Sequence, residues 1–534
     1  MADFNGAMAG ADEVLGGIKR QQVTGLPPSN MLGFSITSGN TKAYIRIMAP
    51  NDTTIDGQVL CTVAGVMVRR KTGSAPTSIY DGTLVLSLDR DTMNQYRVNS
   101  YEDSGLTNGT TYYYRAFPYS DHYIYNLSPA NIKSVVPGVT KIWGFTQTFT
   151  DLAPETTIAY TNENADYTAM HHNKDQGTVT DGSWLGTAFP WLAENLPYMV
   201  KNSDATADYA LDPDDYTLRS DGVTASDVSN KDYDGVAMAW IPKIYSKETY
   251  TTSGRTVQFA LSNKDESTQD FLPVGFLNQD NEELDGIWIP MFYMSSDGNA
   301  YAGSTPVSGL TSDQEYAAMQ AKSESSVFLG GPILNVLRDI EYMLCKSTDV
   351  QKHFGQGRMS AYSSDSSTGV IANAVVGGGR FYGTNANAFN KMFHSNVLGS
   401  YQQAIRDPYT LTISGVMYSS KNYKYDLSGA KLTKTGITIA TSSAWTYPSK
   451  TVYMGDGLGS FPDRSSTNGT TATGLCDGIY TNASGTCAAR RLGDTSAGLD
   501  AGPAYVNLAY APSYSAWNCG VGRALLPAAG YAPA

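Results

Sequence analysis

The C-terminal stretch GDTSAGLDAGPAYVNLAYAPSYSAWNCGVGRALL, residues 493–526, decides how the largest part of the chain is interpreted. Gly493, Gly498 and Gly502 permit sharp turns and Pro512 stiffens the chain, so this stretch can present side chains without forming a regular element. Its tyrosines offer rigid amphipathic contact area, and its serines and aspartates add adaptable hydrogen bonds, as in antibody binding loops. The residues therefore predict a contact surface. Because the chain holds 36 tyrosines, the alternative is that these rings are merely half-buried on a β-sheet surface.

Length and composition indicate a folded chain of several domains. Apolar residues make up 41% and charged residues 16% of the 534 positions, and there are 52 glycines. A chain of this length exceeds one hydrophobic core, so about two to four domains are expected. The wealth of Tyr, Gly, Ser, Thr and Asn favours short strands separated by turns over long helices or disorder.

The charge of the chain excludes nucleic acid as a partner. The formal net charge is −13, whereas a nucleic-acid-binding protein presents a basic stripe to the phosphates. The strongest basic run, Arg69-Arg70-Lys71, is interpreted as the solvated end of a strand.

Neither export signals nor metal motifs are indicated. The first residues, MADFNGAMAGADEVLGG, show no basic segment followed by an apolar one, and no apolar stretch has the length of a membrane span. The five cysteines, at 61, 345, 476, 487 and 519, lack paired CxxC spacing, so no zinc site is expected. Cys476 and Cys487 could form a disulfide, but buried free thiols are favoured. No metal and no cofactor is predicted.

Residues 1–25 are predicted to contain a helix that serves oligomerisation or attachment. Apolar residues recur at alternating spacings of four and three, and the pattern ends before Pro27 and Pro28; the members are Phe4, Met8, Ala11, Leu15 and Ile18. Such a seam needs a partner because a helix this short is marginal in water. The partner is either the helix's own domain or further copies of the chain, with a homotrimer expected.

Residues 31–137 are predicted to form a β-sandwich. In the stretch Leu106–Ala116 a turn leads into a strand whose Tyr112, Tyr114 and Ala116 share one face. This stretch resembles the Leu-x-Pro-Gly-Thr-x-Tyr segment of fibronectin type III domains, with Asn108 where Pro is usual. The resemblance implies a spacer domain in which a tyrosine at this corner hydrogen-bonds back to the backbone.

Residues 138–235 give the weakest signal and are interpreted as a β-rich connecting domain. His171 and His172 are adjacent and would point to opposite faces of a strand, so they are expected to be surface residues. The acidic run at Asp212 has neither the loop glycine nor the terminal Glu of a calcium-binding hand.

Residues 236–534 are predicted to form the largest domain. Strands are indicated at 236–245, 257–261 and 287–293. One helix is expected to begin at Pro332, because the following apolar residues make one stripe at helical spacing: Ile333, Val336, Leu337, Ile340, Met343 and Leu344.

Three stretches of this last domain together resemble phage proteins with a C-type-lectin-like fold, which is also the fold of the formylglycine-generating-enzyme group. They are Asp285-Gly-Ile-Trp-Ile289, Phe381-Tyr-Gly383 and the terminal run from Tyr505 to Leu526. The terminal run is similar to the variable region of proteins diversified by retroelements, of which phage tropism determinants are the known type. The first 140 residues separately resemble the N-terminal part of tail fibres from phages of gut Firmicutes.

The resemblance implies a variable binding segment at 491–523. In such systems template adenines are randomised, and an Asn codon changed at its first two bases cannot yield Lys, Glu, Gln, Met or Trp; none of these occurs between Arg491 and Ala516. The implied ligand-binding positions are Asp494, Ser496, Ala497, Leu499, Asp500, Ala504, Tyr505, Ala509, Tyr510, Tyr514 and Ala516. The implied scaffold positions are Trp517, Asn518, Gly520 and Arg523.

Catalysis is not expected. The formylglycine-generating group uses a pair of active-site cysteines that bind copper, and Cys519 has no second cysteine within a few residues. A glycan depolymerase needs two carboxylates that flank the scissile bond. The last Glu is Glu341, so a C-terminal pair would have to come from the aspartates at 456, 463, 477, 494 and 500, whose spacing singles out none.

The sequence thus predicts a mainly β protein with some α structure: an N-terminal helix, a fibronectin type III-like sandwich and a C-terminal C-type-lectin-like α+β domain. The expected function is that of a phage receptor-binding protein at the tail tip of the virion. It would be made in the host cytoplasm, and would join other tail proteins through its N-terminus and a host surface protein or glycan through its C-terminal segment. A structural fibre or decoration protein without a ligand, and a tail-associated glycan depolymerase, are the alternatives.

Overall fold

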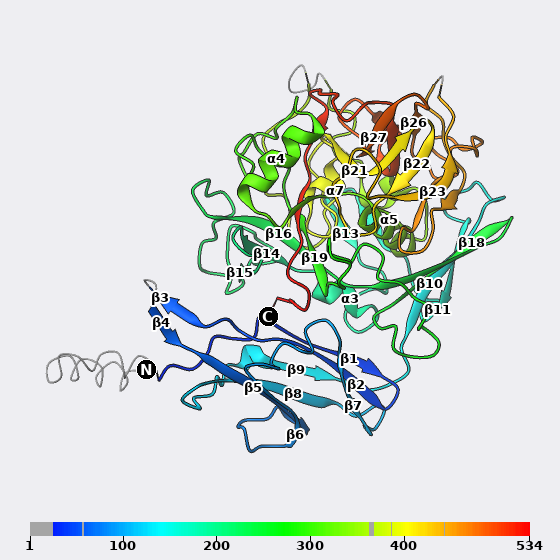
Figure 1. Ribbon diagram of the computed structural model, residues 1–534. Coiled ribbons are helices and arrows are strands. Elements are labelled where there is room, and N and C mark those ends of the chain that lie inside the picture. Colours follow the sequence, from blue (N-terminus) through cyan, green and yellow to red (C-terminus); the bar gives the residue numbers. More distant parts are fainter. Residues whose placement is uncertain (1–24, 56–57, 363–367, 386, 443, 534) are drawn as a thin grey trace. The chain divides into compact units, whose positions relative to one another are not determined.

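A computed structural model describes residues 25–533, apart from 56–57, 363–367, 386 and 443 (Figure 1). The protein is mainly β, with 35% strand and 9% helix, and it contains several antiparallel sheets and a curled half-barrel. The Cα positions divide it into two compact units. Among the described residues, unit 1 comprises 25–140, 264–267 and 529–533, and unit 2 comprises 141–263 and 268–528. The helix predicted at residues 4–18 lies outside the described residues.

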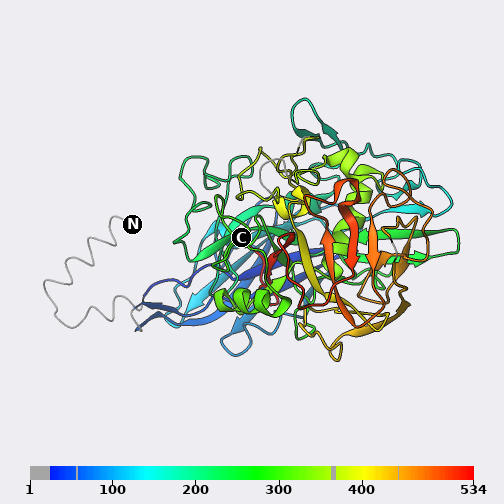
Figure 2. The same ribbon diagram turned by 90° about the horizontal axis from the view of Figure 1, so that it is seen from above.

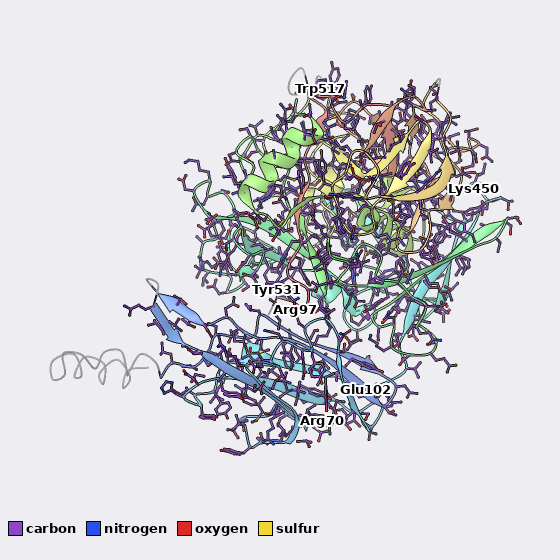
Figure 3. The ribbon with its side chains drawn as sticks, in the orientation of Figure 1. Arg70, Arg97, Glu102, Lys450, Trp517 and Tyr531 are labelled. Carbon is purple, nitrogen blue, oxygen red and sulfur yellow. The ribbon has the colours of Figure 1, made fainter. Side chains whose placement is uncertain are left out.

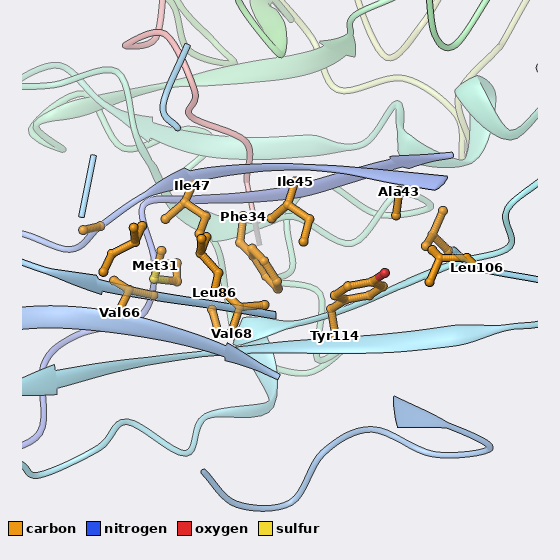
Figure 4. Packing of buried hydrophobic residues seen from close by; sticks show 14 residues of the cluster. Met31, Phe34, Ala43, Ile45, Ile47, Val66, Val68, Leu86, Leu106 and Tyr114 are labelled. Carbon is orange, nitrogen blue, oxygen red and sulfur yellow. The ribbon is translucent and has the colours of Figure 1, made fainter. Parts of the chain in front are cut away.

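Unit 1 contains two antiparallel sheets that share one core. The first has the order β1 (Gly33–Gly39), β2 (Lys42–Met48), β7 (Tyr101–Ser104); the second has the order β6 (Thr83–Asp89), β5 (Val63–Thr72), β8 (Tyr112–Ser120), β9 (Ile132–Val135). Phe34 and Ile45 from the first sheet meet Val66, Val68 and Tyr114 from the second (Figure 4). A short hairpin, β3 (Thr53–Ile55) and β4 (Gln58–Cys61), and one 3-10 turn, Pro129–Asn131, complete the unit.

The β8 strand confirms the predicted alternation. Tyr114 and Ala116 are fully buried in the core and Tyr112 packs against it. The Tyr112 hydroxyl accepts a hydrogen bond from the Thr107 backbone N–H at 3.0 Å, which is the tyrosine-to-backbone bond that the sequence led us to expect. The bond ties the turn to the strand that follows it.

The basic run Arg69-Arg70-Lys71 lies at the end of β5, where Arg69 and Lys71 are partly exposed as predicted, but the Arg70 side chain is only 19% exposed. Arg70, labelled in Figure 3, donates to Asp103 at 2.6 Å, and the Tyr114 hydroxyl donates to the same carboxylate at 2.7 Å. Asp103 lies on β7, so this half-buried group links the two sheets.

Unit 2 is built on three larger sheets. A four-stranded sheet has the order β11 (Ile158–Asn162), β10 (Ile142–Thr148), β18 (Gly254–Ala260), β17 (Tyr245–Tyr250). A six-stranded sheet has the order β15 (Ala207–Ala210), β14 (Pro197–Lys201), β16 (Gly235–Pro242), β19 (Gly286–Pro290), β30 (Arg523–Leu525), β20 (Ser326–Phe328). β10 therefore pairs with β18 and β14 pairs with β16, so strands from both predicted regions contribute to one compact unit.

The third sheet carries the C-terminal segment. Its order is β23 (Thr433–Thr438), β22 (Val416–Ser419), β21 (Ala404–Ile413), β27 (Thr486–Leu492), β28 (Gly502–Leu508), β26 (Ile479–Thr481), and β29 (Cys519–Gly520) also pairs with β21. Figure 2 shows its yellow and orange-red strands side by side. Two hairpins, β12 (His171–Asn173) with β13 (Thr178–Thr180) and β24 (Thr451–Tyr453) with β25 (Ser460–Pro462), lie outside these sheets.

The predicted helix is confirmed as α5 (Pro332–Cys345). It begins at Pro332, whose missing N–H costs nothing in a first turn, and every one of its residues is buried. The helix α4 (Ser312–Lys322) was not predicted, although Thr311 and Gln314 form a capping box at its start. The remaining helices are single turns: α3 (Pro190–Glu194), α6 (Val350–Phe354) and α7 (Asn396–Ser400). Within the described residues no helix has the length and apolar character needed to cross a membrane.

The Tyr112 hydroxyl should stabilise unit 1 measurably. We expect Tyr112→Phe to lower the free energy of unfolding of unit 1 by roughly 1 kcal/mol, the usual contribution of one such hydrogen bond. Thermal unfolding and hydrogen exchange at the Thr107 amide measure the effect. Tyr113→Phe removes the neighbouring hydroxyl and is the matched control, for which little change is expected. Equal losses in the two variants would contradict a specific role for the Tyr112 bond.

Glu341 of α5 should make the stability of unit 2 depend on pH. Burial raises its pKa from 4.5 to about 8, and nearby Arg338 offsets this only in part. Between these values the folded protein holds a proton that the unfolded chain releases, so this contribution to stability falls as pH rises through that window. We expect Glu341→Gln to raise the melting temperature at pH 9 and leave it nearly unchanged at pH 4. The exposed Glu324→Gln is the control, and a pH-independent effect would be the contrary result.

Candidate functional site

The predicted segment 491–523 runs through two different kinds of structure. Its first part turns from β27 through the 3-10 turn Gly498–Asp500 into β28, and its second part is a loop from Ala509 to Asn518 that leads to β29. The expected turn glycines are confirmed, because Gly493, Gly498 and Gly502 have φ values of +94°, +57° and +148°. At Gly502 a side chain would also collide with the Asp477 carboxylate, since a Cβ would lie 2.2 Å from its Oδ1.

The structure divides the predicted ligand-binding positions into a surface group and a buried group. Ser496 and Leu499 are exposed. A second set is half-buried and reaches the surface: Ala497, Asp500, Ala509, Tyr510, Tyr514 and Ala516. The third set, Asp494, Ala504 and Tyr505, is buried at 2%, 1% and 2% exposure.

The buried group corrects the prediction that the whole segment is an irregular loop. β28 pairs with β27 on one side and with β26 on the other, so Ala504 and Tyr505 belong to a central strand whose residues are all buried. Asp494 is buried because its carboxylate is turned inward, where it accepts from the Ser496 backbone N–H at 2.9 Å and from Asn518 Nδ2 at 2.9 Å. These three side chains support the surface from within.

Tyr510 and Tyr514 form a stacked pair at the surface. Their ring centroids lie 4.1 Å apart with an interplanar angle of 25°. The Arg490 guanidinium packs on both rings, 4.3 Å from the Tyr510 centroid and 5.5 Å from that of Tyr514. A cation held against two ring faces restricts their motion, because each contact is electrostatically favourable.

Arg490 is itself fixed by polar contacts beneath the rings. It lies on β27, is 3% exposed, and its Nη1 lies 3.0 Å from Cys519 Sγ and 3.4 Å from Asn518 Oδ1. Asn518 in turn donates to Asp494. The two charges of this region, on Arg490 and Asp494, are therefore connected through one amide and shielded from water.

Trp517, three residues after Tyr514 in the sequence, belongs to a second aromatic pair. Trp517, at the outer edge of unit 2 in Figure 3, stacks on Tyr362 with centroids 5.4 Å apart and an angle of 30°. Tyr362 is 51% exposed, and its backbone N–H donates to the Thr495 carbonyl at 3.0 Å. Trp517, predicted as scaffold, is only half-buried. We call the four rings of Tyr362, Tyr510, Tyr514 and Trp517 the aromatic surface.

The other predicted scaffold positions hold the ends of this segment. Gly520 lies against Gln403, whose Oε1 would be 2.4 Å from an added Cβ. Arg523 is fully buried and donates to Asn202 Oδ1 at 2.7 Å, to Ser326 Oγ at 3.0 Å and to Asn299 Oδ1 at 3.3 Å. Burial lowers the Arg523 pKa to about 10, with Asp297 opposing the shift.

The carboxylates of this region have local structural partners. The five C-terminal aspartates considered as possible catalysts each accept a hydrogen bond from a nearby group: Asp456 from the Tyr453 hydroxyl, Asp463 from the Ser465 N–H, Asp477 from the Ala504 N–H, Asp494 from the Ser496 N–H and Asp500 from the Tyr447 hydroxyl. In the described part of the chain no group of three or more His, Cys, Asp or Glu side chains is placed to hold a metal ion.

The cysteines do not form pairs. All five are free and buried, as favoured from the sequence for Cys476 and Cys487. Burial also raises the pKa of both of these thiols, which keeps them protonated.

Two residues of the site were not predicted. Arg490 precedes the predicted segment by one position, and Tyr362 comes from a distant Gly- and Ser-rich stretch. Neither has a local sequence signal, because their roles depend on contacts with Tyr510 and Trp517 that only the fold brings about.

Searches against protein-family models and curated proteins found no match to this sequence.

The Arg490 charge should order the loop that carries Tyr510 and Tyr514. We expect Arg490→Met, which keeps an apolar stem of similar length, to increase hydrogen exchange across 509–516 and to destabilise unit 2 by about 1–2 kcal/mol, as expected for a buried cation–π contact. Arg490→Lys retains the charge and should show a smaller effect. If the amides of 509–516 exchange at the same rate in both variants as in the unmodified protein, the guanidinium does not order the rings.

Proposed function

We propose that this protein is a phage receptor-binding protein that adheres to the host cell through the aromatic surface, without catalysis. The observation that carries the proposal is the pair of rings of Tyr510 and Tyr514, which reach the surface while stacked on a buried arginine. Rings fixed in advance lose little conformational entropy when a partner covers them, so their contact area contributes to affinity. Tyr and Trp are also the residues that dominate binding energy in protein interfaces.

The finer fold assignment belongs to the same proposal. We assign unit 1 to the fibronectin type III-like sandwiches, which is supported by its sheets of three and four strands and by the bond at Tyr112. We assign the part of unit 2 that contains the terminal motif to the C-type-lectin-like fold. Unit 1 would then act as a spacer, and residues 1–25 as the attachment and trimerisation element that joins other tail proteins of the virion.

Diversification by a retroelement is proposed for the surface positions of the segment. Ser496, Leu499 and the half-buried positions can change without disturbing the core, whereas Ala504 and Tyr505 lie in a central strand. A near-copy of the 3′ coding end that differs only at adenines, beside a reverse transcriptase gene, is the observation that would establish it. The partner would be a host surface protein or glycan, chosen by whichever side chains occupy these positions.

Two other functions remain as alternatives. A structural fibre or decoration protein would have the same fold and no ligand. A glycan depolymerase would need two carboxylates at the scissile bond, and the hydrogen bonds that engage the C-terminal aspartates favour turn and packing roles over catalysis. Release of sugar from host surface polysaccharide by the full-length protein would favour the depolymerase.

Removal of the Tyr510 and Tyr514 rings should abolish adhesion. We expect the double variant Tyr510→Ala, Tyr514→Ala to lose binding to host cells. Because both rings are partly exposed, unit 2 should stay folded, with its free energy of unfolding lowered by about 1–2 kcal/mol, the contribution of the contacts with Arg490. Labelled full-length protein and a cell-binding assay measure the effect. The matched control is Tyr80→Ala, Tyr123→Ala in unit 1, which removes two rings that are 84% and 73% exposed. Undiminished binding by the first variant would disprove the proposal.

A further inference from the structure

The loop that carries Tyr510 and Tyr514 is held from outside the predicted segment, by α4 and the residues before it. The Ser312 N–H donates to the Pro512 carbonyl at 3.0 Å, and the Gly309 N–H donates to the Ala516 carbonyl at 3.1 Å. Figure 1 shows α4 beside the red C-terminal part of the chain. These two bonds fix the two sides of the loop to the start of α4.

Arg406 of β21 makes the third connection. Its Nη2 donates to the Tyr514 carbonyl at 3.1 Å and to the Leu310 carbonyl at 2.8 Å, so one guanidinium bridges the loop and the segment before α4. Its Nε donates to Glu315 Oε2 at 2.6 Å. The geometry of the bridge therefore depends on a carboxylate in the first turn of α4.

The pair of Arg406 and Glu315 is enclosed. The two side chains are 2% and 1% exposed, and Glu315 Oε1 has no hydrogen-bond partner among the described residues. The other titratable groups near Glu315 in the described part of the chain include Tyr316 of α4, Tyr425, which stacks on Tyr316, and Asp313, which accepts from the Tyr425 hydroxyl. Arg406 is therefore the cation that faces Glu315, and water does not screen their interaction.

We propose that Glu315 and Arg406 are positioning residues that set the conformation of the 509–516 loop and so the presentation of Tyr510 and Tyr514. The link to adhesion rests on the proposed function, whereas the positioning of the loop does not. Neither side chain touches a ligand in this scheme, because both are buried beneath the loop.

The positioning should weaken as the solution becomes acidic. Burial raises the pKa of Glu315 to about 7, although Arg406 opposes the shift. At pH 8 the carboxylate is charged and orients the guanidinium, and at pH 6 it is mostly neutral, which weakens that hydrogen bond. Because the folded-state pKa exceeds the unfolded value of 4.5, the contribution of this group to global stability rises, not falls, as pH decreases. Protonation of Glu315 should therefore loosen the 509–516 loop without lowering the global stability. Protonation of an ordinary stabilising salt bridge lowers the global stability.

Hydrogen exchange at the Gly309, Ser312 and Tyr514 amides provides the test, since each is hydrogen-bonded in or against the loop. In the unmodified protein we expect these amides to exchange about tenfold faster at pH 6 than at pH 8 after correction for the intrinsic rate, the factor that corresponds to one charge-assisted hydrogen bond. Glu315→Gln should exchange at the fast rate at both pH values. Glu315→Asp should restore part of the pH dependence, and the exposed Glu324→Gln should behave like the unmodified protein.

The outcomes separate this inference from the proposed function. Exchange rates that do not change between pH 6 and pH 8 in the unmodified protein would overturn the positioning role, and that measurement requires no variant to fold. Arg406→Lys, which can reach fewer acceptors, should lose protection at Tyr514 and Ser312 and keep its charge. If the exchange results hold but cell binding does not follow the loop or the Tyr510 and Tyr514 rings, the proposed function fails while the positioning role stands.

Discussion

The buried ion pair between Arg255 and Asp339 is the interaction on which the arrangement of unit 2 depends. Arg255 of β18 binds Asp339 of α5 through two hydrogen bonds, at 2.7 and 3.0 Å, and the same buried group includes Arg338, Ser460, Glu248 and Gln147. Burial alone would raise the pKa of Asp339, but the two arginines hold it below its usual value. Charges enclosed in this way are tolerated only when each has its partner, so α5, the four-stranded sheet and β25 cannot move independently.

The buried polar contacts of α5 also influence the aromatic surface, through strand β27. Arg490 and Arg491 are neighbours on β27, and neighbouring residues of a strand point to opposite faces. Arg491 points inward, where it donates to Asn335 of α5 at 3.2 Å and lies 3.5 Å from Asp407. That contact sets the register of β27, and the register places Arg490 under Tyr510. A shift by one residue would turn Arg490 to the opposite face of the strand, away from the rings.

The sequence predicts those features that depend on local periodicity and turn chemistry. The α5 stripe, the alternation along β8 and the glycine turns of the C-terminal segment were all visible in this way. What it could not show depends on pairing between distant strands. The turn-like composition of Gly502-Pro503-Ala504 predicts a loop where β28 lies, yet β26 and β27 cover both edges of this strand. Likewise α4 is short and weakly amphipathic, so its role beneath the loop appears only in its contacts.

The burial of β28 limits how the terminal segment can vary. A substitution at Ala504 would enter a fully packed strand, where even one added methylene costs stability. A substitution at Ser496 or Leu499 meets solvent and changes only the surface. Substitutions that preserve the fold are therefore confined to the two loops on either side of β28. The rigid part of the site consists of β28 and Arg490. A variable surface on this scaffold would keep the same backbone position and orientation, whichever side chains it carried.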